Sequence, residues 1–216
     1  MTEFENYIEY ELDISRANKS PVRVLQDPTG VGRCGVGSTV WDAGLVLAKY
    51  LDKQTQDGTL SLSGKTVLEL GSGTGLVGLA LAKLQPACTV ILSDKSELVP
   101  LLERNISLNC AQPNTTAVCL DWCDPESGSD VGPVDMILVS DGVWASELHT
   151  PLAETLGRLA GEHTRVILAF ESRNFEEEAM FVALWSQKFR FHDIKPQDQH
   201  PVMQSEDIFL FEGQRK

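Results

Sequence analysis

Short apolar runs that alternate with segments of helical periodicity constrain the fold of this 216-residue chain more than any other feature. The runs are apolar throughout, which is typical of parallel strands buried on both faces. They cover residues 65–70, 89–93, 117–120, 136–140 and 165–170. Apolar residues recur at helical spacing in the intervals, as in the series Leu98, Leu101, Leu102 and Ile106. Strand and helix in alternation predict a doubly wound α/β sheet with right-handed crossovers.

The end of the chain extends this pattern. Residues 175–185 predict one more amphipathic helix. Two β-rich stretches follow, at 189–194 and 208–211, and a polar loop with two prolines joins them. Such a loop suits an antiparallel pair that closes the edge of the sheet.

The start of the chain carries a weaker pattern. Residues 41–51 predict a helix on the sheet, and a glycine-rich turn at 30–38 precedes it. The first dozen residues are acidic and are expected to be mobile. We therefore divide the chain into a mobile acidic segment, 1–20, and a single domain, 21–216.

The charge balance limits the classes of ligand. Asp and Glu number 31 against 18 Lys and Arg, which gives a net charge of -13 and a pI near 4.7. This acid excess repels phosphate backbones, so nucleic acid is not expected as a main ligand. A basic macromolecule or a small cationic ligand fits better.

Compartment and metal content follow from other features of the composition. The longest apolar run, 76–82, is far shorter than the roughly 18 residues of a membrane span, and no secretory signal begins the chain. The five cysteines include no CxxC pair and indicate reduced thiols. A zinc set of Cys119, Cys123, His192 and His200 matches no common ligand spacing. We expect a cytoplasmic protein, also present in the nucleus, without a metal or a membrane partner.

The sharpest local motif is the glycine-rich turn that begins at Glu69 and contains Gly71 and Gly73, between a strand and a helix. Such a turn alone is a weak signal, since several classes of nucleotide binder use one. A carboxylate at Glu69 would repel a pyrophosphate and attract a cationic ligand. Asp94 ends the next strand, where its carboxylate can accept both ribose hydroxyls. A ribose without a phosphate, plus a positive charge, describes S-adenosylmethionine better than NAD.

Two more strand ends carry polar or aromatic residues that could contact a ligand. They are Asp121 with Trp122 and Ser140 with Asp141. Ligands of open parallel sheets bind outside the carboxyl ends of the strands, so these residues and Asp94 should meet in one crevice. Trp122 is interpreted as either an adenine-side contact or a core aromatic residue. Asp141 could face the ligand, cap the following helix, or do both.

Several segments together are similar to the family-16 seven-β-strand protein lysine methyltransferases. They are GVGSTVWDAGLVLAKYL, VLELGSGTGLVGL, SDKSELVPLLERNISLN, LDW, ILVSDGVWASELHTPL and MQSEDIFLF, and the similarity runs from about Pro21 to the end. The resemblance implies methyl transfer from S-adenosylmethionine to the ε-amine of a lysine in a protein, with S-adenosylhomocysteine as the product. It also implies a sheet of order 3-2-1-4-5-7-6 with one antiparallel strand. The partner it implies is an AAA ATPase or another cytosolic protein, bound by a monomer.

Residue by residue, the resemblance places the cofactor contacts on Trp41, Gly71, Ser72, Gly73, Asp94, Trp122 and Ser140, to which the motif adds Glu69. The family's D-x-x-Y/F signature falls on Asp141 to Trp144, where Trp replaces Tyr or Phe. Trp keeps a π-face for a cationic amine but has no phenol. Glu171 and Arg173 resemble an acidic and basic pair of these enzymes, although a surface ion pair explains them nearly as well.

These residues suggest a mechanism. A lysine amine has a pKa of about 10.4, so the neutral nucleophile is scarce at pH 7. We expect Asp141 to attract the ammonium and orient the amine after proton loss, while Trp144 walls the channel. Three alternatives stay open: a small-molecule N- or S-methyltransferase, an NAD-dependent oxidoreductase and a non-catalytic binding module.

Overall fold

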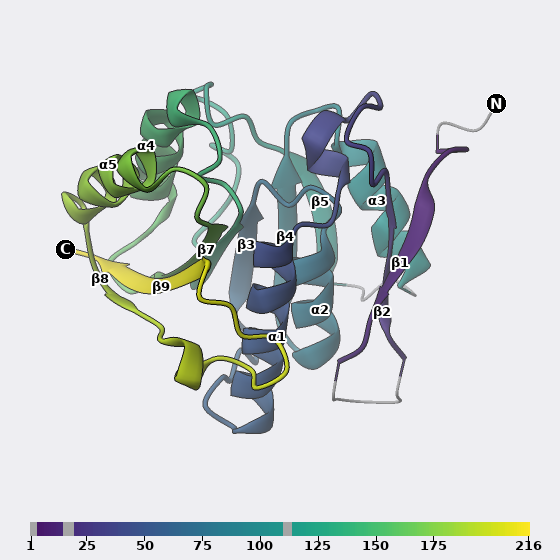
Figure 1. Cartoon of the computed structure of the whole chain (residues 1–216), viewed down its shortest axis with the longest axis horizontal. Coiled ribbons are helices and arrows are strands. Elements are labelled where there is room, and N and C mark those ends of the chain that lie inside the picture. The colour runs from purple at the N-terminus through teal and green to yellow at the C-terminus, as the bar shows by residue number, and fades with distance from the viewer. Residues whose placement is uncertain (1–3, 15–19, 110–113) are drawn as a thin grey trace.

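The fold is organised by one seven-stranded sheet, seen in a computed structural model that describes residues 4–14, 20–109 and 114–216 (Figure 1). Its strands are β3 (Thr66–Leu70), β4 (Thr89–Asp94), β5 (Thr115–Cys119), β6 (Met136–Ser140), β7 (Arg165–Glu171), β8 (Phe189–Asp193) and β9 (Ile208–Arg215). They lie in the order β5-β4-β3-β6-β7-β9-β8, and β9 runs antiparallel to both neighbours. Counted from β3, this is the predicted order 3-2-1-4-5-7-6 with one antiparallel strand, and the prediction is confirmed.

Helices cover both faces of the sheet (Figure 1). The first face carries α1 (Asp42–Gln56), α2 (Leu76–Leu84) and α3 (Val99–Leu108), and the second carries α4 (His149–Leu159) and α5 (Phe175–Ser186). Successive residues of β3 show why apolar residues occupy consecutive positions in this strand. Val67 packs in the core of the first face and Leu68 in the core of the second. The helices predicted at 41–51 and 175–185 are confirmed, with α1 extending five residues further to Gln56.

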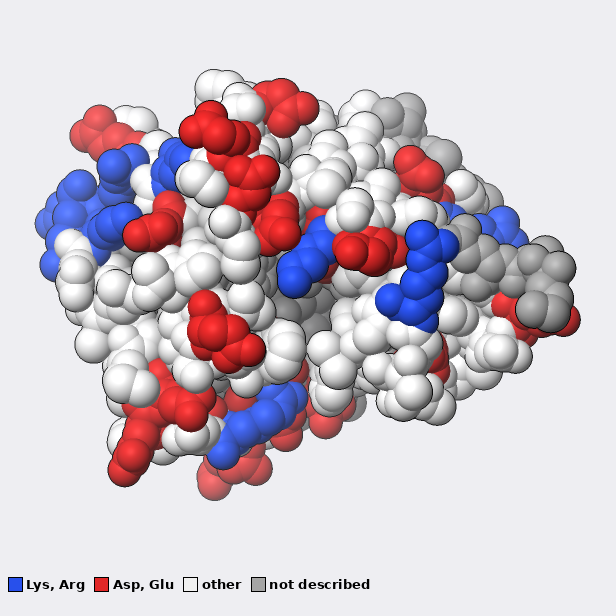
Figure 2. Space-filling view, turned by 90° about the horizontal axis from the view of Figure 1, so that it is seen from above, with Lys and Arg blue, Asp and Glu red and all other residues white. Residues whose placement is uncertain are grey.

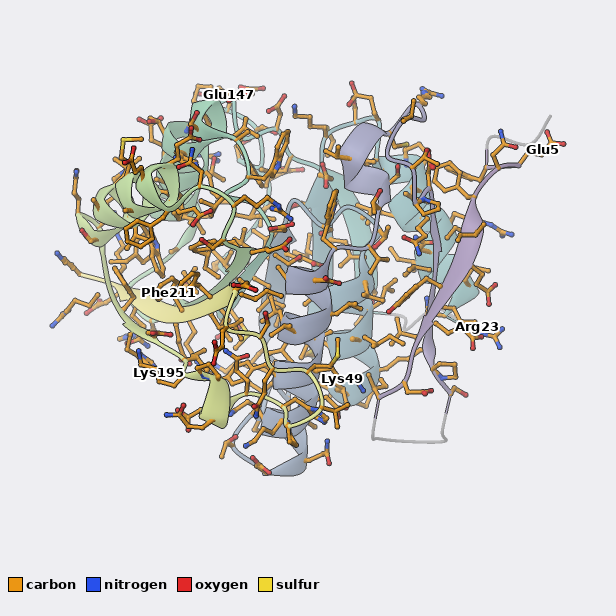
Figure 3. All side chains as sticks on the ribbon, in the orientation of Figure 1. Glu5, Arg23, Lys49, Glu147, Lys195 and Phe211 are labelled. Carbon is orange, nitrogen blue, oxygen red and sulfur yellow. The ribbon has the colours of Figure 1, made fainter. Side chains whose placement is uncertain are left out.

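The prediction that residues 1–20 form a mobile segment is wrong for the part that the structure describes. Strand β1 (Ile8–Leu12) pairs antiparallel with β2 (Val22–Gln26), so the start of the chain forms a two-stranded ribbon. Residues 1–3 and 15–19 lie outside the described residues. Figure 3 shows Arg23 on this ribbon and Glu5 just before β1, both at the opposite side of the molecule from Phe211 in β9.

Two asparagines explain why the ribbon docks: Asn105 in α3 and Asn109 at the C-cap of that helix. Asn105 Oδ1 accepts the N–H of Leu25 at 2.8 Å, and its Nδ2 donates to the carbonyl of Leu25 at 3.1 Å. Asn109 forms the same pair with Arg23, at 3.0 and 2.6 Å. Four helical residues rise about 6 Å and two strand residues about 6.6 Å, so the two amides match alternate positions of β2. The two amides thus form the hydrogen bonds to β2 that the backbone of a neighbouring strand would form. Apolar periodicity in the sequence cannot reveal such contacts.

Among the described residues, no helix combines the length and the apolar character needed to cross a membrane.

Candidate active site

One pocket, of about 280 Å³, opens at the carboxyl ends of the central strands. All ten residues predicted for the site line it: Trp41, Glu69, Gly71, Ser72, Gly73, Asp94, Trp122, Ser140, Asp141 and Trp144. Figure 2 looks down on the molecule from above, and acidic and basic side chains lie around a central hollow in that face. We distinguish two sides of the pocket: the glycine-turn side (residues 69–73 and Asp94) and the ion-pair side, which consists of the lining residues Asp141, Trp144 and Arg173 together with Glu171, the second partner of Arg173.

The glycine turn needs glycine for its backbone and for the space around it. Gly71 and Gly73 have left-handed φ angles of 64° and 56°, which strain other residues. A Cβ at Gly71 would lie 2.7 Å from the Trp122 ring, and one at Gly73 would lie 2.6 Å from the carbonyl oxygen of Gly37. The turn therefore lies directly against an indole on one side and against the segment around Gly37 on the other.

Hydrogen bonds fix the turn to the end of β4. The N–H of Ser72 donates to the carbonyl of Ser93, and the Ser72 hydroxyl accepts the N–H of Ser93, both at 2.9 Å. Both serine hydroxyls donate to the carbonyl of Glu69. Ser72 and Ser93 are buried, so these bonds hold the turn in a fixed place without help from solvent.

Glu69 corrects the electrostatic reasoning drawn from the sequence. Its side chain is buried, and Oε2 accepts the N–H of Gly78 in α2 at 2.9 Å. Burial raises its pKa to about 8, so the carboxyl group is mostly neutral at pH 7. The prediction that a Glu69 carboxylate attracts a cation is therefore wrong in its cause, because the group joins β3 to the start of α2 while lining the pocket.

Asp94 holds the other end of the glycine turn. Its Oδ2 accepts the N–H of Gly73 and its Oδ1 the N–H of Lys95, both at 2.8 Å. Desolvation raises its pKa to about 6, against the two backbone N–H groups, which lower it. Asp94 therefore remains largely ionised at pH 7 and presents a carboxylate to the pocket.

Trp41 joins the two sides of the pocket. It immediately precedes α1, and its indole Nε1 donates to the carbonyl of Val36 at 3.0 Å. Val36 and Gly37 belong to the short helix η1 (Gly35–Ser38) and line the pocket. The guanidinium carbon of Arg173 lies 5.3 Å from the centre of the Trp41 ring, in cation–π geometry.

Asp141 has an unusual backbone. Its φ of 53° is the one left-handed value of a non-glycine residue in the described part of the chain. Aspartate tolerates this region better than most residues, and such conformations concentrate at functional sites. Asp141 caps neither following helix: η2 (Ser146–Leu148) begins after Ala145 and α4 after Leu148, without a side-chain cap. The interpretation of Asp141 as a helix cap is therefore wrong.

Arg173 binds Asp141 with both terminal nitrogens. Nη1 donates to Oδ1 at 3.0 Å and Nη2 to Oδ2 at 2.8 Å, and Nη2 also lies 2.7 Å from a Glu171 oxygen. This hydrogen-bonded pairing with Asp141 raises the pKa of Arg173 above its ordinary value. The Asp141 side chain is 7% exposed, so the arginine reaches into the pocket and the pair is more than a surface contact.

The two tryptophans differ in exposure. Trp122 is half-buried, touches the core of the second face and also lines the pocket, so its contact with the core leaves it within reach of a ligand. Trp144 is 54% exposed and lies at the pocket where Leu148 also contributes. Its ring therefore forms part of the rim.

Sequence reasoning missed several lining residues. The segment around η1 contributes Val36, Gly37, Thr39 and Val40, and Lys95 follows the end of β4. Asp121, which was expected in the crevice, also lines the pocket. The glycine-rich run at 30–38 was a signal for the first group, because Gly37 and Gly73 approach closely. The position of Lys95 directly after a strand end was the signal for that residue.

The residues considered for zinc do not meet. Cys119 ends β5 and His192 lies in β8, which are the two opposite edge strands of the sheet. Cys34, Cys88, Cys119 and Cys123 are free thiols, and Cys110 lies outside the described residues. No group of three or more potential metal ligands occurs in the parts of the chain that the structure describes.

The pocket fits an adenosyl sulfonium compound better than a dinucleotide. Its acidic lining residues Asp94, Asp121 and Asp141 outnumber its basic residues Lys95 and Arg173, and Arg173 is already paired with carboxylates. Trp41, Trp122, Val36 and Leu120 supply apolar walls. A pyrophosphate would meet this acidic lining with repulsion, whereas a ribose and a cation would be attracted.

Known proteins resemble this chain in sequence. A family described as "Lysine methyltransferase" matches residues 19–187. "Protein N-lysine methyltransferase METTL21A" of Danio rerio is 32% identical over 173 residues, which cover 79% of this chain and 76% of the relative. "EEF1A lysine methyltransferase 3" of Mus musculus is 32% identical over 193 residues and 78% of each chain.

Solved structures resemble the chain in fold. An O-methyltransferase family protein of Burkholderia thailandensis superposes with a TM-score of 0.61 at 11% identity, covering 80% of this chain and 57% of that one. PigF with SAH gives a TM-score of 0.59 at 16% identity, covering 79% of this chain and 56% of that one. The chain therefore spans somewhat over half the length of these two structures.

Proposed function

The chain belongs to the lysine methyltransferase family, and from this premise we propose how its pocket methylates the ε-amine of a protein lysine. It is an S-adenosylmethionine-dependent protein lysine methyltransferase. The observation that carries the proposal for the site is the bidentate pair of Arg173 and Asp141, beside a glycine turn tied to Asp94. Both features line the same pocket.

The glycine-turn side is proposed to hold the cofactor. The Asp94 carboxylate would accept the ribose hydroxyls, and Trp41 and Trp122 would pack against the adenosyl portion. When bound, S-adenosylmethionine supplies a sulfonium-activated methyl group and leaves as S-adenosylhomocysteine. The left-handed turn and the hydrogen bond from the Gly73 N–H to Asp94 support this assignment, because they hold the Asp94 carboxylate at the pocket.

The ion-pair side is proposed to receive the lysine. Asp141, Glu171 and Arg173 together carry one net negative charge, which attracts an ammonium group without holding it as strongly as two free carboxylates would. Trp144, exposed at the rim, would pass the aliphatic stem and ammonium along its ring face. The amine releases its proton to solvent, and its alignment against the methyl group supplies most of the rate.

The protein acceptor is proposed from the family resemblance and from the charge of the chain. Resemblance to the family favours an AAA ATPase or another cytosolic protein, and the names of two relatives contain EEF1A. We propose that the enzyme acts as a monomer in the cytoplasm and also in the nucleus. The net charge of -13 supports a basic patch on the acceptor, with attraction that weakens as salt rises.

The test is isotope transfer in an extract of cells that lack this protein. Purified enzyme and tritiated S-adenosylmethionine are added, and the labelled bands are digested and examined by mass spectrometry. We expect label on lysine of one protein. An AAA ATPase in the labelled band would support the first acceptor, and EEF1A would support the second. Label confined to small molecules would contradict the proposal, as would cofactor binding without any transfer.

A further inference from the structure

Arg173 contacts several separate parts of the pocket, whereas a surface ion pair needs only one partner. Its guanidinium meets Asp141 at the end of β6, Glu171 at the end of β7 and the ring of Trp41 before α1. Its backbone N–H donates to Glu178 Oε1 at 2.5 Å, and the N–H of Asn174 donates to the same oxygen at 2.8 Å. Glu178 is buried. The arginine is therefore fixed at both its backbone and its head.

The guanidinium of Arg173 places a positive charge in the pocket among several carboxyl groups. The charged groups around this region are Asp141 from β6, Glu171 from β7, Glu178 from α5, and Asp94, Lys95 and Asp121 from the opposite side of the pocket. Arg173 keeps its proton at every accessible pH. An amine placed against Asp141 must therefore also lie close to the guanidinium, because two of its nitrogens are within 3.0 Å of the Asp141 oxygens.

A nearby cation disfavours the protonated form of an amine, whereas nearby carboxylates favour it. Without Arg173, Asp141 and Glu171 would hold a lysine ammonium between two negative charges and raise its pKa. The attacking nitrogen must be neutral, so such a site would bind its substrate in the unreactive form. Asp141 alone thus explains attraction of the ammonium but opposes the proton loss that has to follow.

We propose that Arg173 is a positioning residue that opposes protonation of the acceptor amine through its fixed positive charge and holds Asp141 in place. The inference rests on the proposed function of the pocket. The amine proton leaves to solvent, and the freed electron pair of nitrogen forms the new bond to carbon as the carbon–sulfur bond breaks toward sulfur. Arg173 itself exchanges no proton.

The first test measures how the charge of Arg173 affects binding of the cofactor, and it needs no acceptor protein. Calorimetry gives the affinities of S-adenosylmethionine, which is a cation at sulfur, and of S-adenosylhomocysteine, which is neutral there. In Arg173→Met we expect the preference for S-adenosylmethionine to rise on the order of tenfold, because a repelling charge has been removed. Arg173→Lys should keep the wild-type preference. A local structural defect would weaken both ligands together.

The second test uses pH. Initial rates of tritium transfer into the labelled band of the deletion extract are measured from pH 6.5 to 10. In Arg173→Met the acidic limb of the rate profile should move up by about one pH unit, with activity recovering at high pH. In Arg173→Lys the limb should stay in place while the rate falls at every pH, because the bidentate geometry is lost.

Arg165→Met is the matched control. Arg165 lies at the other end of β7 and pairs with Glu212 at 2.7 Å. The substitution therefore removes the same positive charge at a position away from the pocket. The inference is overturned if Arg173→Met leaves both the ligand preference and the pH limb at their wild-type values. It is equally overturned if Arg165→Met shifts them as much. Absence of transfer by the wild type would instead contradict the proposed function, with the ligand preference still measurable.

Discussion

The glycine-turn side and the ion-pair side of the pocket are held together by different forces. On the first, backbone groups and buried hydroxyls bond at short range, and Glu69 is largely uncharged at pH 7. On the second, Asp141 is fixed by Arg173, which lies in the loop after β7 and has a side chain that is 38% exposed. The first side should therefore resist salt and fail when packing is disturbed. The second should tolerate changes of shape and respond to charge.

The largest expected effect is on the glycine-turn side. Gly73→Ala forces a Cβ to within 2.6 Å of the Gly37 carbonyl oxygen at a left-handed φ, so the turn or the segment around Gly37 must shift and the geometry at Asp94 is disturbed. We expect S-adenosylmethionine affinity, measured by calorimetry, to fall by at least about 100-fold. Gly132→Ala is the control, because Gly132 has open space around it. Wild-type affinity in Gly73→Ala would contradict the claim that the glycine-turn side fails when its packing is disturbed.

The second prediction concerns pH. The native pKa of Glu69 is about 8 against an ordinary value of 4.5. Between these values the folded state keeps a proton that the unfolded state has lost, so the free energy of unfolding falls as pH rises. From pH 6.5 to 8.5 the wild type should lose about 2 kcal/mol more than Glu69→Gln.

Urea unfolding at both pH values measures this difference, above the range in which Asp94, with a pKa of about 6, contributes most. Glu147→Gln, which changes an exposed acid, should behave as the wild type does. If the free energy of unfolding changed equally with pH in the wild type and in Glu69→Gln, Glu69 would be charged in the native state. The two sides of the pocket would then differ less than described.

The third prediction tests whether the N-terminal ribbon belongs to the glycine-turn side. Asn105 bonds Leu25 twice and also donates to the carbonyl of Thr74, beside the turn. Asn105→Ala should lower the free energy of unfolding by about 2 kcal/mol, because buried backbone groups lose their partners. Asn114→Ala, at an exposed position, is the control in thermal melts. A loss equal to that of the control would show that the amide contributes nothing.

The smallest expected effect lies on the rim of the ion-pair side. Trp144 is 54% exposed, so Trp144→Ala removes a solvated cation–π contact. Methyl transfer should fall about fivefold at unchanged S-adenosylmethionine affinity, and Trp144→Phe should recover most of the rate. If Trp144→Ala weakened cofactor binding instead, the assignment of Trp144 to the ion-pair side would have to be abandoned.

The sequence predicted the sheet well because its signals are local. Each buried strand is apolar throughout, and each strand end carries its polar residue directly afterwards, as Asp94 and Asp141 do. Strand order and the antiparallel strand came from resemblance to a family. The state of Glu69 was beyond such reasoning, since it depends on a burial that the residue's place beside the turn does not disclose.

Long-range polar contacts explain the remaining errors. The pairing of Asn105 with Leu25 spans 80 residues, and that of Arg173 with Asp141 spans 32. Neither leaves a periodicity in the sequence. For that reason the ribbon at the start of the chain was expected to be mobile, and Arg173 was explained nearly as well by a surface pair.

The central claim is that binding of the cofactor and methylation of the acceptor reside on separate sides of one pocket. Asp141→Asn tests it most directly, because asparagine tolerates the left-handed φ and removes only the charge. Calorimetry and tritium transfer are measured on the same preparation. The account predicts that affinity for S-adenosylhomocysteine, which is neutral at sulfur, stays within about twofold of the wild type, and that transfer is reduced on the order of 100-fold. Undiminished transfer, or affinity lost in proportion to transfer, would contradict it.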